Sequence, residues 1–176
     1  MLDGQRQGSI NIFTPVGPEW KLAGAGDVNG DGTEDILWQH INGQVHFWPM
    51  LNGQRQGGIN IFTPVGPEWK LAGAGDFNGD GTDDILWQHV FGQVHFWPML
   101  NGQRQRGVNI FTPVGRDWIL VGGGDVSGDG TDDILWQHVF GQVHFWPMLN
   151  GQRQGGVNVF SPVGPDWRLA GVGSVD

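Results

Sequence analysis

The chain has 176 residues, among them 32 glycines and 10 tryptophans, but no tyrosine or cysteine. Its formal net charge of −9 argues against nucleic acid and anionic membranes as partners, and the lack of cysteine excludes disulfides and thiolate metal sites. No apolar run approaches the roughly 18 residues of a membrane-spanning helix, and residues 1–9 lack the basic and apolar regions of a signal peptide. The high glycine and aromatic content favours short strands joined by tight turns.

The sequence repeats itself every 49 residues, with equivalent methionines at Met1, Met50, Met99 and Met148. We therefore divide the single repeat domain, residues 1–176, into three full repeats and one partial repeat, namely residues 1–49, 50–98, 99–147 and 148–176. The repeats are nearly identical, which indicates either recent duplication or deliberate engineering.

Each repeat contains four short segments with the alternation and turn signals of β-strands. In the second repeat, residues 59–63 alternate and end at a proline, and residues 69–74 form a small apolar strand that leads into an acidic loop. Residues 84–89 follow this loop, and residues 93–97 follow a Phe-Gly turn. Four strands in a unit of roughly 40–50 residues are typical of a β-propeller blade. A stacked solenoid could use the same strands, but its coils are usually shorter.

These strands predict an all-β fold, a β-propeller of four-stranded antiparallel blades with about 3.5 repeats per chain. The small residues 71–75 suit the crowded innermost position, and the bulkier Trp and Phe strands suit the wider space between blades. A lone outer-type strand at 9–14 and a lone inner-type strand at 167–173 flank the three complete units. Such an arc has exposed edges, so we expect closure by homo-oligomerisation, for example as a dimer.

Each full repeat carries a glycine-rich acidic loop between two of its strands. The second repeat reads Asp-Phe-Asn-Gly-Asp-Gly-Thr-Asp-Asp over residues 76–84, with oxygen-bearing side chains at loop positions 1, 3, 5 and 9. Calcium takes about six to eight oxygen ligands, and alternate residues of a tight loop can point inward together. We therefore predict about one Ca²⁺ per complete repeat, with the position-7 threonine offering its backbone carbonyl. The candidate ligands are Asp27, Asn29, Asp31, Thr33, Asp35, Asp76, Asn78, Asp80, Thr82, Asp84, Asp125, Ser127, Asp129, Thr131 and Asp133.

The loop is not an EF-hand, because position 12 is Trp38 where that motif needs a bidentate glutamate. An alternative is an ordinary solvated turn, since Asp, Asn and Gly are also common turn formers. Nine of the 18 acidic residues lie at the ligand positions, where like-charge repulsion disfavours them unless a cation is bound. The threefold recurrence of the same oxygen positions favours calcium.

Repeated aromatic and cationic residues give a second set of candidate ligand-binding residues. Tryptophans beside Gly-Pro turns can stack on sugar rings, and arginines in the Asn-Gly-Gln-Arg turns can bind hydroxyls. These candidates are Trp20, Trp69, Trp118, Trp167, Arg55, Arg104 and Arg153. A solvated hairpin tip is at least as good an interpretation of the arginine turns. Paired histidines such as His89 and His95 could bind a transition metal, but packing and strand-to-strand hydrogen bonding is the preferred interpretation.

No nucleophile–base–acid set and no phosphate-binding glycine loop occurs in the sequence. A site repeated in every unit also fits multivalent binding better than catalysis, which usually breaks the symmetry of its scaffold. We therefore expect a protein that is not an enzyme.

Residues 75–87, together with the following Gly-Gln-Val-His-Phe-Trp-Pro-Met, resemble the FG-GAP/VCBS repeats of bacterial surface proteins, integrin α-subunit propellers and some propeller lectins. The resemblance covers essentially the whole chain. It implies a propeller, usually of seven blades, with calcium in the loop between the first two strands of each blade. Ser127 departs from the pattern by replacing asparagine, which implies a weaker third site.

The resemblance implies a non-catalytic calcium-binding propeller that binds carbohydrate or a surface protein, as an adhesion or lectin-like module. It also implies an extracellular or cell-surface location. The alternative is a purely structural or engineered self-assembling scaffold that binds no ligand beyond metal. The expected partners are a second copy of the chain and a carbohydrate or surface protein, with no nucleic acid and no membrane insertion.

Overall fold

The computed structural model describes residues 9, 11–12, 16–62, 64–111, 114–160 and 164–171. All regular structure in these ranges is β-strand, as the glycine, proline and aromatic content predicts. None of the described residues forms a helix long and apolar enough to cross a membrane. The all-β prediction is therefore confirmed.

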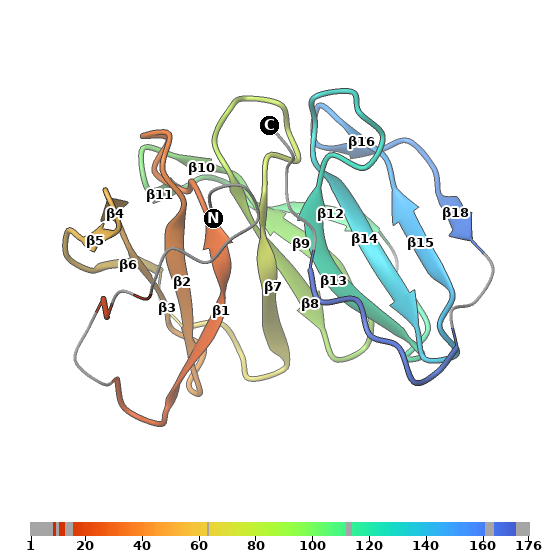
Figure 1. Ribbon diagram of the computed structural model, residues 1–176, viewed down its shortest axis with the longest axis horizontal. Coiled ribbons are helices and arrows are strands. Elements are labelled where there is room, and N and C mark those ends of the chain that lie inside the picture. The colour runs from red at the N-terminus through yellow and green to blue at the C-terminus, as the bar shows by residue number, and fades with distance from the viewer. Residues whose placement is uncertain are drawn as a thin grey trace.

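Three four-stranded antiparallel sheets, called blades 1 to 3 here, follow one another along the chain (Figure 1). Blade 1 contains, in spatial order, β1 (Trp20–Gly26), β2 (Asp35–His40), β3 (Val45–Trp48) and β6 (Ile59–Phe62). Blade 2 contains β7 (Trp69–Gly75), β8 (Asp84–His89), β9 (Val94–Trp97) and β12 (Val108–Phe111). Blade 3 contains β13 (Trp118–Gly124), β14 (Asp133–His138), β15 (Val143–Trp146) and β18 (Val157–Phe160).

The outermost strand of each blade comes from the next 49-residue repeat, so a blade straddles a repeat boundary. The two lone strands expected at the chain ends, 9–14 and 167–173, lie partly outside the described residues. Of residues 9–14 only Ser9, Asn11 and Ile12 are described, and none of them is in a strand. Residues 167–171 follow blade 3 without forming a strand, and residues 172–173 lie outside the described residues.

Three small two-stranded hairpins, which the sequence analysis treated only as turns, follow the third strand of each blade. They pair β4 (Met50–Leu51) with β5 (Gln54–Arg55), β10 (Met99–Leu100) with β11 (Gln103–Arg104), and β16 (Met148–Leu149) with β17 (Gln152–Arg153). Asn52 and Gly53 both have positive φ, 51° and 73°, which is the backbone of a tight type I′ hairpin turn.

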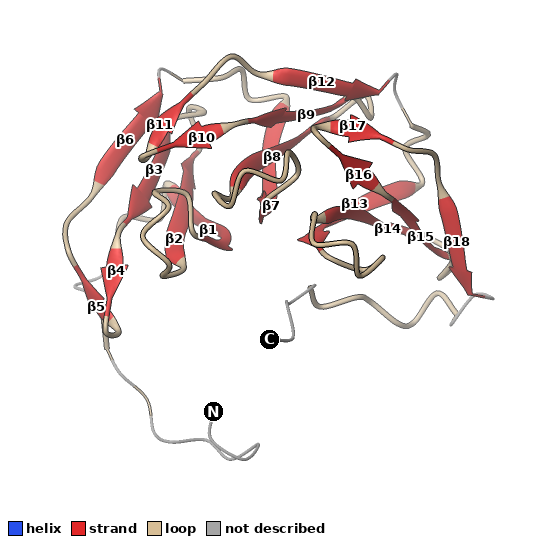
Figure 2. Ribbon diagram, turned by 90° about the horizontal axis from the view of Figure 1, so that it is seen from above, coloured by secondary structure: helices blue, strands red, loops and turns tan. Residues whose placement is uncertain are grey.

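The innermost strands β1, β7 and β13 carry the small residues that were expected at the crowded innermost position. Each strand has a bulge just before a glycine, at Gly24, Gly73 and Gly122. A Cβ on Gly24 would lie 3.4 Å from the Cα of Gly73, so glycine allows neighbouring inner strands to approach closely. Seen from above, the blades form an open arc with the inner strands toward its centre (Figure 2).

The hydrophobic core lies between blades, where large aromatic side chains fill the wider outer space. The cluster between blades 1 and 2 includes Phe47 from the first blade and Leu71 and Trp87 from the second. The cluster between blades 2 and 3 includes the equivalent Phe96, Leu120 and Trp136. The sheets do not close into a ring, and the fold is an incomplete β-propeller.

Candidate metal loops and ligand pockets

The acidic loop of blade 1 connects β1 to β2 and winds around the carboxylate of Asp27 at its first position. One oxygen of Asp27 accepts hydrogen bonds from the amides of Gly30 (2.8 Å) and Asp31 (3.0 Å), and the other accepts from Gly32 (2.7 Å). Gly30 and Gly32 have positive φ, 76° and 84°, so the curl requires glycine at both positions. The loops of blades 2 and 3 repeat these three bonds around Asp76 and Asp125.

The ninth loop residue, Asp35, lies fully buried at the base of the loop as the first residue of β2. Its Oδ1 accepts hydrogen bonds from the amide of Met50 (3.1 Å) and from Nδ2 of Asn29 (3.3 Å). Its Oδ2 is buried and has no hydrogen-bond partner, and the same holds for Oδ2 of Asp84 in blade 2. A buried carboxylate oxygen without a partner is costly unless a cation completes it.

In blade 3 the equivalent carboxylate oxygen, on Asp133, already has a hydrogen-bond partner. Oδ2 of Asp133 accepts a hydrogen bond from the amide of Ser127 at 2.7 Å. Ser127 is also the residue that departs from the asparagine of the other two loops. The hydrogen bonding of the third loop therefore differs from that of the other two at Ser127, the residue at which its sequence also differs.

Burial raises the pKa values of the ninth-position carboxyls. The pKa of Asp35 is raised to about 6 and that of Asp84 to about 8, in each case mainly by burial and then by the neighbouring loop carboxylates. The pKa of the Asp133 carboxyl is raised for the same main reason. At the exposed end of the third loop, the pKa of Asp125 is lowered, chiefly by the hydrogen bond from the Gly130 amide. The third loop thus places a buried carboxyl that is costly to ionise below an exposed one whose charge is stabilised by loop amides.

The eighth loop residue, which the sequence analysis did not select, joins neighbouring blades. Oδ2 of Asp83 in blade 2 accepts a hydrogen bond from the amide of Asp27 in blade 1 (2.9 Å), and the Asp83 amide donates to the Asp27 carbonyl (3.0 Å). Asp132 and Asp76 form the same pair between blades 3 and 2, at 3.0 and 2.9 Å. Burial and nearby carboxylates raise the pKa of Asp83 to about 7. An acid at position 8 of every loop was the signal that could have indicated this role.

The remaining candidate ligands lie along the same loops. Asp31, Asp80 and Asp129 each accept a hydrogen bond at Oδ1 from the amide of the position-7 threonine, namely Thr33, Thr82 and Thr131. Across the described ranges, no group of three or more His, Asp or Glu side chains is arranged to hold a metal ion. The residues that the sequence selected are therefore gathered in one loop per blade, and the aspartates at positions 1 and 5 bond to loop amides in this conformation.

Three equivalent pockets lie at the opposite end of the blades. The first, about 340 Å³, lies between blades 1 and 2, and the second, about 400 Å³, lies between blades 2 and 3. The third, about 470 Å³, lies between blade 3 and residues 167–169. Their shared lining comes from equivalent repeat positions, with Gln39, Trp69 and Leu71 in the first, Gln88, Trp118 and Leu120 in the second, and Gln137, Trp167 and Leu169 in the third.

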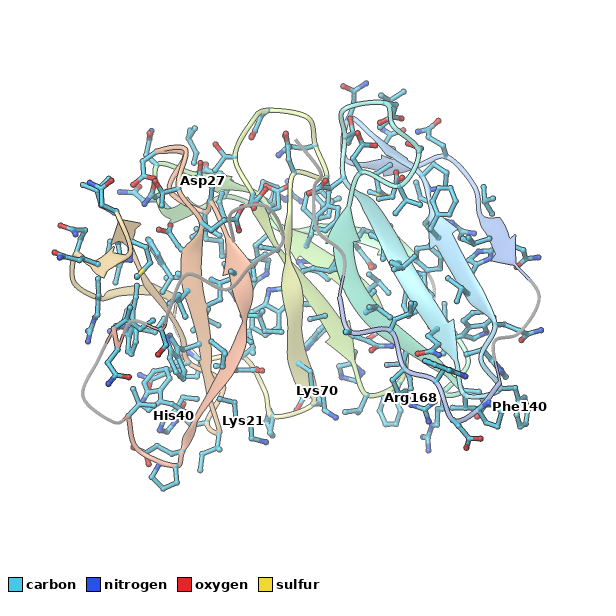
Figure 3. The ribbon with its side chains drawn as sticks, viewed as in Figure 1. Lys21, Asp27, His40, Lys70, Phe140 and Arg168 are labelled. Atoms are coloured by element: carbon cyan, nitrogen blue, oxygen red, sulfur yellow. The ribbon has the colours of Figure 1, made fainter. Side chains whose placement is uncertain are left out.

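Each of these junction pockets is also lined by at least one cation. Lys70 lines both the first and the second pocket, and Arg168 lines the third. Figure 3 shows Lys21, Lys70 and Arg168 at the lower edge of the molecule, whereas Asp27 lies at the upper edge. The acidic loops and the junction pockets thus occupy opposite ends of the arc.

The glutamine of each junction pocket holds the next inner strand in place. Gln39 donates from Nε2 to the Trp69 carbonyl (2.8 Å) and accepts at Oε1 from the Leu71 amide (3.1 Å). Gln137 makes the equivalent bonds to the Trp167 carbonyl (2.8 Å) and the Leu169 amide (3.0 Å). The terminal segment therefore occupies the place of an inner strand.

The predicted tryptophan and arginine candidates are only partly brought together. Trp69, Trp118 and Trp167 line the junction pockets, whereas Trp20 packs at the edge of the cluster around Trp38 on blade 1. Trp167 is 68% exposed. Arg55, Arg104 and Arg153 lie over the rings of Trp48, Trp97 and Trp146, at 4.1 to 4.2 Å from the ring centroids. In blade 3, Trp118 and Arg153 line a common pocket of about 250 Å³.

The paired histidines flank the inner tryptophan of their blade. The ring of Trp20 lies 4.8 Å from that of His40 and 5.7 Å from that of His46. His46 Nδ1 is 2.9 Å from Oδ1 of Asn60 on the neighbouring strand, and His40 Nδ1 accepts a hydrogen bond from the Asn42 amide. These contacts match the packing and strand-to-strand bonding that the sequence analysis preferred.

A model of the FG-GAP-like repeat family matches the chain twice, over residues 27–87 and 76–136, which together span more than half of it. Among solved structures, a lectin of Agrocybe aegerita described as recognising non-reducing terminal N-acetylglucosamine is similar, with 18% identity and a TM-score of 0.58 over 81% of this chain and 39% of that one. The structure of TcdB2-TccC3 without its hypervariable C-terminal region is similar with 17% identity and a TM-score of 0.53, over 74% of this chain and 8% of that one. The chain thus spans less than half of either structure, and these identities support the fold alone. The search of curated protein sequences gave no match.

Proposed function

The chain belongs to the FG-GAP-like repeat family and folds as an incomplete propeller, and from this premise we propose a calcium-stabilised, non-catalytic module that binds carbohydrate. The acidic loops are the proposed calcium sites. The junction pockets at the other end of the blades are the proposed carbohydrate sites. The observation that carries the binding function is the recurrence of one pocket, with tryptophan, leucine and glutamine at equivalent positions, at three successive places along the arc.

The chemistry of the loops fits calcium. Blades 1 and 2 each leave one fully buried aspartate oxygen without a hydrogen-bond partner, on Asp35 and Asp84. Two further carboxylates and an asparagine carbonyl lie in the same short loop, and hard oxygen donors of this kind are what Ca²⁺ selects. In blade 1 the proposed ligands are Asp27, Asn29, Asp31 and Asp35, with the Thr33 carbonyl.

Bound calcium would supply positive charge to a loop whose carboxylates otherwise repel one another. Residues of the chain itself organise the loop and connect it to neighbouring elements. The Asp27 carboxylate organises three loop amides, and Asp35 ties the loop base to the hairpin at Met50. Asp83 connects the loop to the next blade. An ordered loop therefore fixes the relative position of two blades.

The junction pockets have the features of a sugar site. A tryptophan, half-buried in the first two pockets and exposed in the third, offers an apolar face for the C–H surface of a pyranose ring. A lysine or arginine beside it can bind hydroxyl, acetamido or carboxylate oxygens. Similar pockets at regular intervals suit a multivalent ligand, because linked sites raise the apparent affinity. The lectin from Agrocybe aegerita, which shares this fold, makes terminal N-acetylglucosamine the first probe to use.

A glycan array that contains N-acetylglucosamine-terminated and acidic glycans would test this proposal, followed by titration of the best glycan with tryptophan fluorescence. Lys70→Ala removes a cation shared by two pockets, and we expect it to raise the half-saturation concentration about 5- to 10-fold, which corresponds to about 1 kcal/mol. Arg106→Ala is the matched control, because Arg106 is exposed and lines none of the three junction pockets.

Trp167→Ala is a second informative variant, because Trp167 is largely exposed and its loss leaves the blade cores intact. In the single chain, where residues 167–169 line the third pocket, we expect it to abolish binding at that pocket and leave the first two unchanged. Equal binding by all variants would place the carbohydrate site elsewhere. A complete lack of glycan binding by the unmodified protein would overturn the carbohydrate proposal and favour a structural scaffold.

A further inference from the structure

The two open ends of the arc carry the same residues that form the junctions inside the chain. At an internal junction, one blade presents its acidic loop and an apolar face, and the next presents an inner-strand leucine, an eighth-position acid and a hairpin. We propose that blade 3 of one chain binds blade 1 of a second copy, head to tail, through a third junction of the same kind.

The open side of blade 1 exposes a leucine that the other blades bury. Leu71 and Leu120, which pack against the preceding blade, are each 8% exposed. The equivalent Leu22 is 66% exposed, because no blade precedes it among the residues that the structure describes. The strand sequence Trp-Lys-Leu-Ala-Gly-Ala-Gly is identical in β1 and β7, so β1 can make the contacts that β7 makes.

The open side of blade 3 exposes the complementary surface. Val28 and Phe77, at the second loop position of blades 1 and 2, are fully buried by the following blade, whereas the equivalent Val126 is 40% exposed. Phe145 is only partly buried, although the equivalent Phe47 and Phe96 are fully buried. An exposed leucine at one end therefore meets an exposed apolar face at the other, as at the internal junctions.

The polar contacts of the junction are also available. Inside the chain, the amide of each first loop residue bonds to the eighth-position carboxylate of the following blade, as Asp76 does with Asp132. The Asp125 loop has no following blade within the described residues, and Glu34 of blade 1 has no preceding loop. In the proposed junction, Glu34 of one copy accepts from the Asp125 amide of the other. The third acidic loop is completed only by a second copy.

Terminal segments of the chain hold parts of both open faces in the single chain. Residues 167–169 bond to Gln137 where an inner strand belongs, and Ile12 packs on the Trp38 cluster where an outer strand belongs. None of the described residues in these two segments is in a strand. A second copy brings whole strands with the same side chains, so its β1 replaces residues 167–169 and its β18 replaces Ile12. This exchange of identical elements is a low-cost route to assembly.

Head-to-tail junctions close into a ring when the rotation per blade allows it. Two chains supply six complete blades, which lies within the range of about four to eight blades found in closed propellers. The open arc of Figure 2 leaves both end faces accessible for this closure.

Light scattering after size-exclusion chromatography, across a roughly hundredfold range of concentration, tests the proposal, because association responds to concentration by mass action. We expect the mass of two chains for the unmodified protein. Val126→Arg and Leu22→Lys, which change exposed side chains at opposite ends, should each give the mass of one chain with an unchanged circular dichroism spectrum. Leu100→Lys is the matched control, because Leu100 is 51% exposed in an internal hairpin and should leave the two-chain mass unchanged.

Mixing the two end variants gives the sharper result. Val126→Arg chains keep an intact blade 1 face, and Leu22→Lys chains keep an intact blade 3 face, so an equimolar mixture should form two-chain complexes through one remaining junction. A mass of one chain for the unmodified protein at every concentration would overturn the proposal. Two-chain complexes of either variant alone would overturn the head-to-tail arrangement.

Discussion

The carboxylate of Asp83 accepts a hydrogen bond from the Asp27 amide at 2.9 Å, while the Asp83 amide returns one to the Asp27 carbonyl at 3.0 Å. The two residues belong to the loops of different blades, so the first residue of one candidate calcium loop is fixed by the eighth residue of the next. Asp132 and Asp76 repeat the relationship one blade further. The conformation of each loop is therefore linked to the packing of neighbouring blades.

Replacing this acid tests the link between blades. We expect Asp83→Ala to lower the free energy of unfolding by about 1–3 kcal/mol, because it leaves the partly buried Asp27 amide without its acceptor. Asp83→Asn, which retains an acceptor oxygen, should cost less. Glu34→Ala is the matched control, since no blade precedes Glu34 in the described part of the chain, and in the Val126→Arg background it should change the free energy by less than about 0.5 kcal/mol. Urea unfolding measures all three, and equal effects of Asp83→Ala and Glu34→Ala would contradict the account.

The raised pKa values predict how stability depends on pH without calcium. Burial raises the pKa values of Asp83 to about 7 and of Asp84 to about 8, so the folded state holds these protons more tightly than the unfolded state. Their contribution to stability is greatest at acidic pH and is lost as pH rises through the folded values. We expect the urea midpoint in chelator to fall between about pH 5 and pH 8. Saturating calcium should remove much of that fall, because it favours the ionised loop.

Leu71 and Leu22 occupy equivalent positions, but Leu71 is buried and Leu22 is exposed, and this difference in burial provides a test of the packing. Leu71→Ala should lower the free energy of unfolding by about 2–5 kcal/mol, because this leucine is buried between blades 1 and 2. Leu22→Ala should cost less than about 1 kcal/mol in the Val126→Arg background, where Leu22 remains exposed. Chemical denaturation of both variants measures the difference, and similar losses would show that Leu22 is buried in the single chain.

The third loop should bind calcium more weakly than the first two. Ser127 donates its amide to the Asp133 oxygen whose equivalents in Asp35 and Asp84 have no hydrogen-bond partner. Ser127→Asn restores the side chain found in the other loops, and we expect it to lower the dissociation constant of the weakest site by about 5- to 10-fold. Calorimetry of the variant beside the unmodified protein would show this change, and an unaltered isotherm would contradict it.

The blade strands could be predicted from the sequence because turn residues such as glycine and proline separate the short apolar segments of each repeat. The strands expected at 69–74 and 84–89 match β7 and β8 to within one residue. The lone inner-type strand at 167–173 was wrong over its described part, because a strand needs a paired neighbour and the segment has no second strand of its own blade. The local sequence pattern indicates that a segment can pair as a β-strand, but it does not indicate whether a partner strand lies beside it.

Candidate loop residues were found from spacing, but their roles between blades were not. Loop positions 1, 3, 5, 7 and 9 can be selected from the sequence because calcium ligation within one loop needs alternating oxygens. The contact of Asp83 with Asp27 joins residues 56 positions apart, beyond the reach of any local pattern. The packing of Gly102 against Phe47 and Asn29 is likewise visible only after the blades are assembled.

Calorimetric titration of metal-stripped protein with Ca²⁺, together with melting curves in calcium and in chelator, tests the central claim that the acidic loops hold calcium and thereby fix the blades. We expect two tighter sites and one weaker site per chain, and a higher melting temperature in calcium, because a ligand that binds only the folded state stabilises it. No heat of binding and no shift in melting temperature would contradict the claim and reduce the loops to ordinary turns.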